Sequence, residues 1–141
     1  MRYLKTFRTV SQAAEEGFLH AIKRTCYDTF YPFQIFPQKG LQQVEFDDIT
    51  LFYGGNGSGK STLLNVIAAE IGAERMAAFN KSNFWDDYVR RCETEYYSTQ
   101  TENRCIITSD DVFDYMLDIR SLNDGIHEKR EERLAEYTGY K

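Results

Sequence analysis

The fold is decided by the stretch Tyr53-Gly54-Gly55-Asn56-Gly57-Ser58-Gly59-Lys60-Ser61-Thr62. It fits the phosphate-binding pattern G-x-x-x-x-G-K-[ST], which begins at Gly54 and ends at Ser61. Glycines let the backbone approach a ligand closely, so that successive amide N–H groups can surround an anion. We therefore predict a nucleotide-phosphate site formed by the residues Gly54, Gly55, Asn56, Gly57, Ser58, Gly59, Lys60, Ser61 and Thr62.

Two side chains of this stretch have predicted roles of their own. Lys60 supplies a compact cation between the outer phosphates of a nucleotide, and the Ser61 hydroxyl takes one position on Mg²⁺. The flanks favour this interpretation over a simple glycine-rich turn. Residues 49–53 are β-branched and aromatic and predict a buried strand, whereas residues 63–71 repeat apolar side chains at helical spacing. Gly72 is a natural end for that helix.

The composition indicates one folded domain, because 42% of the 141 residues are hydrophobic and 15% are aromatic. No stretch approaches the length of a membrane span, and residues 1–5 lack a secretory apolar segment, so we expect a cytoplasmic protein. The formal net charge of −5 gives no support for nucleic-acid binding, although it does not exclude a local basic face. Cys26, Cys92 and Cys105 form no C-x-x-C pair, which favours free thiols over a zinc site or a disulfide.

Residues 1–48 are predicted to be rich in β-structure. The two prolines of this region cannot donate to a strand ladder, so a strand that they bracket belongs at a sheet edge. The predicted elements are an edge strand over residues 2–10, a short helix over residues 11–20, a strand between Pro32 and Pro37, and a strand over residues 43–46.

Residues 73–141 are predicted to be mostly helical, with one strand near residues 104–108. One predicted helix is capped by Ser82, and its apolar face consists of Trp85, Tyr88, Val89, Cys92 and Tyr96. Another begins at Ser109, after the strand, where Asp110 and Asp111 complement the helix dipole in the first turn.

Residues 54–65, Gly-Gly-Asn-Gly-Ser-Gly-Lys-Ser-Thr-Leu-Leu-Asn, resemble the Walker A segment of ABC-type ATPases. The preceding residues 49–53 look closer to soluble AAA-labelled ATPases related to DNA-repair and chromosome-maintenance heads than to transporter cassettes. The resemblance implies an α/β P-loop NTPase fold of the ABC-ATPase type, in which an antiparallel β region leads into a parallel sheet with flanking helices. It also implies Mg-ATP as the ligand, with ATP and Mg²⁺ as cofactors.

The resemblance covers the N-terminal part of such a head. An ABC-type site also needs a signature motif such as L-S-G-G-Q, an apolar strand ending in Asp-Glu, and a switch His, and none of these occurs in the sequence. Asp110 stands where the family places its Q-loop and is the candidate catalytic residue, the alternative being a plain helix-terminal acid. Aromatic residues near Phe33 are candidates for stacking on adenine in the manner of ABC cassettes, with buried sheet packing as the alternative.

These observations lead us to expect residues 1–141 to form a single partial ATP-binding domain, truncated relative to the family's head. It is β-rich over residues 1–48, contains the strand, loop and helix over residues 49–72, and is mostly helical over residues 73–141. We expect it to bind ATP but to hydrolyse it poorly alone, and to complete its site in a head-to-head homodimer or with a partner ATPase chain.

Two other functions fit the same loop. The first is a complete small P-loop phosphotransferase whose acid is Asp110 or Asp111 and whose phosphate-neutralising arginines come from Arg90, Arg91 and Arg104. The second is a non-catalytic, nucleotide-responsive binding module. Phosphate acceptance by nucleoside monophosphates distinguishes the first alternative, and nucleotide-dependent binding without turnover distinguishes the second.

Overall fold

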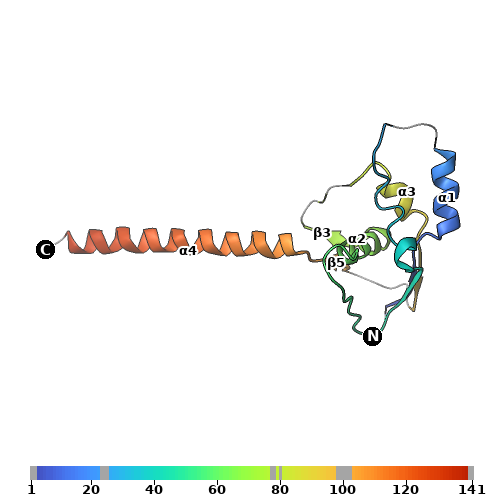
Figure 1. The fold of residues 1–141 in the computed structure, drawn as a ribbon. Helices are drawn as coiled ribbons and strands as arrows, with labels where there is room; N and C mark the ends of the chain where they lie inside the picture. Colours follow the sequence, from blue (N-terminus) through green and yellow to red (C-terminus); the bar gives the residue numbers. More distant parts are fainter. Residues whose placement is uncertain (1–2, 23–25, 77–78, 80, 98–102, 140–141) are drawn as a thin grey trace. The chain divides into compact units, whose positions relative to one another are not determined.

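The computed structural model describes residues 3–22, 26–76, 79, 81–97 and 103–139. The chain divides into two compact units, Met1–Ile106 and Ile107–Lys141. The described elements, labelled in Figure 1 where there is room, follow the order β1 (Leu4–Arg8), α1 (Gln12–Ala21), the 3-10 helix η1 (Pro37–Lys39), β2 (Gln43–Glu45), α2 (Lys60–Glu70), β3 (Glu74–Arg75), α3 (Trp85–Val89), β4 (Glu93–Tyr96), β5 (Cys105–Ile106) and α4 (Ser109–Thr138). Helices and both kinds of strand pairing occur together, so the predicted mixed α/β class is confirmed.

The larger sheet has the strand order β2-β1-β4, and β1 is antiparallel to both neighbours. Phe7 of β1 is opposite Val44 of β2 and Thr94 of β4. The prediction that the first strand lies at an edge was therefore wrong. The cause is β4, since residues 93–96 were assigned to a helix in the sequence and instead supply the second neighbour of β1.

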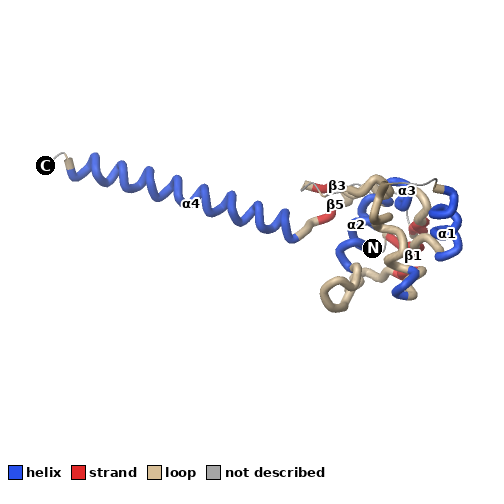
Figure 2. Tube along the Cα trace, turned by 45° about the horizontal axis from the view of Figure 1, so that its top comes forward, coloured by secondary structure: helices blue, strands red, loops and turns tan. Residues whose placement is uncertain are grey.

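The smaller sheet is the parallel pair β3–β5, with Glu74 opposite Cys105 and Arg75 opposite Ile106. Figure 2 shows these two strands next to each other. Because parallel strands need a crossover connection, the long segment between them carries α3 and β4 back to the larger sheet. The predicted strand near residues 104–108 is confirmed in its first half, as β5.

The core of the first unit is dominated by aromatic side chains. Trp85, Tyr88 and Phe7 are fully buried, and Phe36 is 1% exposed. Residues 31–36 form turns, with Gln34 in the left-handed region at φ 68°, so the predicted strand between Pro32 and Pro37 was wrong. Turns let successive aromatic rings enter the core from one short segment, which a strand would direct to alternating faces.

The expected strand over residues 49–53 was also wrong, because this segment is not in a strand. Ile49, Leu51 and Tyr53 are each at least 81% exposed. The physical reason is that neither described sheet extends to these residues, so their backbone has no ladder to join and their side chains no face to cover. The chain enters the glycine loop from an extended, open segment.

Three of the predicted helices are present: α1, α2 and α4, the last of which begins at Ser109 as predicted. Helix α1 is capped by Ser11, whose hydroxyl accepts the Ala14 N–H at 3.3 Å, and α2 begins immediately after the glycine loop, as predicted. Helix α3 is only five residues long and has Phe84 at its N-cap, so the long helix predicted from Ser82 was wrong. Among the described residues, no helix is long and apolar enough to cross a membrane.

The second unit consists mainly of α4, a helix of 30 residues. Thr108 and Asp111 form a capping box: the Asp111 carboxylate accepts both the backbone N–H and the hydroxyl of Thr108 at 2.6 Å. No residue of α4 is buried.

Candidate phosphate-binding site

The glycine loop ends at Gly59, the N-cap of α2, which has φ 90° and no side chain to satisfy the first helical N–H groups. These groups and the positive end of an 11-residue helix therefore face a site for an anion. Gly54 is favoured for a different reason, since a Cβ there would meet the Ser58 hydroxyl oxygen at 2.9 Å. A side chain at that position would require the Ser58 side chain to shift.

Lys60 folds back over the loop. Its Nζ donates to the Gly54 carbonyl at 2.6 Å, the Gly55 carbonyl at 2.8 Å and the Ser58 hydroxyl at 3.0 Å. All three acceptors are neutral, and the ion pairs found among the described residues do not include Lys60. A phosphate oxygen is a stronger partner for an ammonium than a carbonyl, so an anion in the loop can replace these contacts.

A second cation reaches the loop from η1. The Lys39 Nζ donates to the Gly57 carbonyl at 3.0 Å, and no described ion pair neutralises it. Gly59 lies against the same segment: a Cβ there would be 3.4 Å from Ile35 and 3.9 Å from Lys39. Two uncompensated ammonium groups therefore converge on one short loop, and sequence reasoning identified only Lys60.

Ser61 and Thr62 occupy the first turn of α2, after Lys60. Ser61 is exposed, and its hydroxyl is the kind of hard oxygen ligand that Mg²⁺ accepts. No group of three or more acidic, cysteine or histidine side chains that could hold a metal was found among the described residues. A magnesium ion here would therefore need nucleotide oxygens as well as Ser61. The Thr62 hydroxyl accepts the Tyr31 hydroxyl at 3.1 Å and ties α2 to the aromatic segment.

The residues predicted to act in catalysis have mostly structural surroundings. Asp110 belongs to the unit Ile107–Lys141 and is exposed in the first turn of α4, while Asp111 serves as the N3 residue of the capping box. Arg91 pairs with Asp87 at 3.7 Å and lies 4.2 Å from the centre of the Phe18 ring. Arg104 donates to the Ile71 carbonyl. Arg91 and Arg104 are thus engaged in packing, which argues against a phosphotransferase lid.

Phe33 is 3% exposed and stacks on Phe18 with ring centroids 4.7 Å apart. Its other neighbour is Tyr88, in an edge contact at 4.9 Å. A ring enclosed in this way offers no face to a nucleotide base. The predicted stacking role is therefore not supported, and the buried-packing alternative describes Phe33 correctly.

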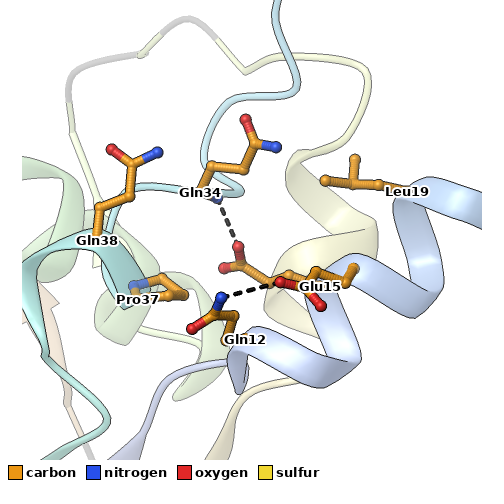
Figure 3. Close-up of a pocket in the computed structure, with 7 residues that line it drawn as sticks. Gln12, Glu15, Leu19, Gln34, Pro37 and Gln38 are labelled. Atoms are coloured by element: carbon orange, nitrogen blue, oxygen red, sulfur yellow. Dashed lines mark hydrogen bonds between the residues drawn. The ribbon is translucent and has the colours of Figure 1, made fainter.

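Glu15 of α1 contacts the aromatic segment, residues 31–36, at Gln34. It is 2% exposed, and its Oε2 accepts the backbone N–H of Gln34 at 2.7 Å (Figure 3). Its Oε1 is buried with no hydrogen-bond partner in the described part of the chain. Burial raises the pKa of this carboxyl, against the opposing effect of the Gln34 hydrogen bond. The sequence analysis predicted a short helix over residues 11–20 and gave no signal of this contact.

Comparison with known families supports the loop assignment. The model of the family described as the P-loop containing region of AAA domain matches residues 36–84. The match includes η1, the glycine loop and α2, and it supports a P-loop ATPase-like, nucleotide-binding region. Searches of curated proteins and of solved structures found no match.

Proposed function

We propose that the chain binds Mg-ATP through the loop of residues 54–62 and is an ATPase of the ABC type. The observation that carries the proposal is the arrangement of charge at the loop. Lys60 and Lys39 contact only neutral acceptors there, and the uncapped start of α2 adds its amide groups. A nucleotide phosphate supplies the negative charge that this arrangement lacks, and Ser61 would hold one position on its magnesium ion.

The reaction that fits this site is slow hydrolysis in the isolated chain. The loop can orient and neutralise phosphates, but Asp110, the candidate for activating water, is exposed in the first turn of α4, in the other unit. Activation of the attacking water is a separate contribution from phosphate binding. We propose that a second head, as a homodimer or a partner ATPase chain in the cytoplasm, supplies the missing groups.

Isothermal titration calorimetry with Mg-ATP tests the binding step. Wild-type protein should bind one nucleotide per chain, and Lys60→Ala should weaken binding by more than tenfold because it removes a charge-assisted contact. Lys39→Met should weaken binding by about tenfold, equal to about 1.4 kcal/mol. Lys129→Met, which makes the same charge change on α4, is the control and should leave the affinity unchanged. Equal binding by wild type and Lys60→Ala would contradict the proposal.

Phosphate release measured with malachite green tests the catalytic step. We expect turnover close to background in the isolated wild-type chain despite saturating Mg-ATP. Fast turnover that disappears in Lys60→Ala would show that the chain holds a complete hydrolytic site. Phosphate transfer to nucleoside monophosphates would instead identify a phosphotransferase.

A further inference from the structure

A cavity of about 400 Å³ adjoins the glycine loop and is hereafter called the amide pocket. One side is formed by residues 33–35 together with Gln38 and Lys39, and the other by Gly57, Gly59 and Thr62. Its volume lies within the range of small-ligand sites. The loop that would hold the phosphates is thus also a wall of a space large enough for a further part of the same ligand.

The side chains that line the amide pocket offer amide groups and an apolar surface. Gln34 and Gln38 each carry one carbonyl acceptor and an NH₂ donor, and Ile35 adds an apolar surface. Among the described residues, no carboxylate lines the pocket. Lys39, the cation in this described lining, already donates to the Gly57 carbonyl at 3.0 Å, and the Thr62 hydroxyl accepts from Tyr31. The two side-chain amides beside Ile35 are therefore the groups that we consider for recognising a ligand.

This chemistry matches one nucleobase better than the others. A glutamine amide can donate to N7 of adenine and accept from its 6-amino group at the same time, whereas guanine presents two acceptors that Arg or Lys reads best. We infer that the amide pocket receives the adenine base of the nucleotide held by the loop, and that Gln34 and Gln38 are its specificity-determining residues. This inference rests on the proposed function.

The backbone that carries the Gln34 side chain is anchored. Gln34 adopts φ 68°, a conformation that side-chain-bearing residues rarely occupy, and Glu15 fixes it by accepting its N–H at 2.7 Å. Figure 3 shows a second pocket, which the same two glutamines line together with Glu15; in it the Gln34 and Gln38 side chains extend in the same general direction from their segment. Glu15 is thus a positioning residue behind the pocket, and its buried carboxylate does not itself touch the base.

The test compares ATP with inosine triphosphate and GTP, which share the triphosphate but lack the 6-amino group. Each nucleotide displaces a fluorescent triphosphate from the whole chain in the presence of Mg²⁺. Wild-type protein should bind ATP about tenfold more tightly than inosine triphosphate or GTP, in line with the discrimination of one bidentate base contact. The variants Gln34→Gly and Gln38→Met should each reduce this ratio, and together bring it to within about twofold.

These variants are chosen to preserve the fold. Glycine relieves the positive φ of Gln34, and methionine keeps the approximate volume of the exposed Gln38 side chain. Gln42→Met is the matched control on an exposed residue outside the pocket and should retain the tenfold ratio.

The outcomes separate this inference from the proposed function. Tight binding of all three triphosphates with equal affinity, or a preference for GTP, would overturn the adenine pocket and leave phosphate binding intact. A tenfold ratio that survives in the double variant would also overturn it. Failure of every triphosphate to bind would overturn both, and a fold check by Trp85 fluorescence confirms that the protein tested was native.

Discussion

The two units of the chain stabilise their structure in opposite ways. In Met1–Ile106, the side chains of Phe7, Trp85 and Tyr88 are fully buried. In α4 no residue is buried over 30 positions. The large hydrophobic side chains exposed along α4 are Val112, Phe113, Tyr115, Met116, Leu117, Ile119, Leu122, Ile126, Leu134 and Tyr137. Hydrophobicity in the sequence therefore does not by itself say where the core is.

The difference has an energetic consequence. The first unit draws its free energy of folding from burial, at roughly 25 cal/mol for each Å² of apolar surface removed from water. Helix α4 depends on local terms instead: its capping box, its acidic first turn and its residue propensities, each on the order of 1 kcal/mol or less. The glycine loop, the candidate nucleotide site, lies in the unit that is held by burial.

The largest effect should come from Phe7→Ala, with Phe113→Ala as its partner on α4. Phe7 is 0% exposed and Phe113 is 62% exposed, although both changes remove the same atoms. We expect Phe7→Ala to lower the free energy of unfolding by about 3–5 kcal/mol, and Phe113→Ala to change it by less than about 0.5 kcal/mol. Urea unfolding followed by the fluorescence of Trp85, the single tryptophan, measures both. Similar losses in the two variants would show that α4 is packed against something.

A smaller effect should come from Glu15→Gln and should depend on pH. Since burial raises the pKa of Glu15 in the folded state, the proton stabilises the native protein. The contribution is complete below the ordinary glutamate pKa and is lost as the pH rises through the folded pKa. Cys92, whose pKa burial raises to about 12, stays neutral over this range.

We therefore expect the stability of Glu15→Gln relative to wild type to increase with pH across that window and then level off. Urea unfolding at a series of pH values measures the difference. Glu16→Gln, an exposed change of charge on the same helix, serves as the control. A difference that is independent of pH would show that Glu15 is not buried as described.

The smallest effect should come from Gly125→Ala in α4. Nothing lies within 4 Å of the added methyl group, so the change acts through helix propensity alone, by about 0.5–1 kcal/mol. In far-ultraviolet circular dichroism, the variant should retain more helix on heating than wild type does. The unfolding transition followed by Trp85 fluorescence should have the same midpoint in both proteins. A shift of that transition would mean that the two units unfold together.

The same contrast explains how much the sequence could predict. The helix over residues 11–20 and the helix after the glycine loop depend on neighbours in the chain, and their predicted positions were correct. Strand β4 was missed because Tyr96 also fits the helical spacing set by Trp85, Tyr88 and Cys92. Only pairing with β1 decides between strand and helix. Whether residues 49–53 join a sheet likewise depends on partners that local propensity does not contain.

At the candidate phosphate-binding site, too, the sequence predicted local features but not contacts between distant residues. Lys60 and Ser61 are predicted from the spacing of one motif, which lies within a single stretch of sequence. Lys39 reaches the loop across 18 residues of sequence, and Glu15 reaches Gln34 across 19. No periodicity or motif marks such contacts, because they exist only once the aromatic segment has turned back on the core.

The most direct test of the phosphate site is the Trp85 unfolding transition with and without Mg-ATP, in wild type and Lys60→Ala. A ligand at a hundred times its dissociation constant should stabilise the first unit by about 2.7 kcal/mol, an upward shift of several degrees in its melting temperature. Lys60→Ala, at the same nucleotide concentration, should lose most of that shift. A folded wild-type protein whose transition does not move, or an equal shift in both proteins, would contradict nucleotide binding through Lys60.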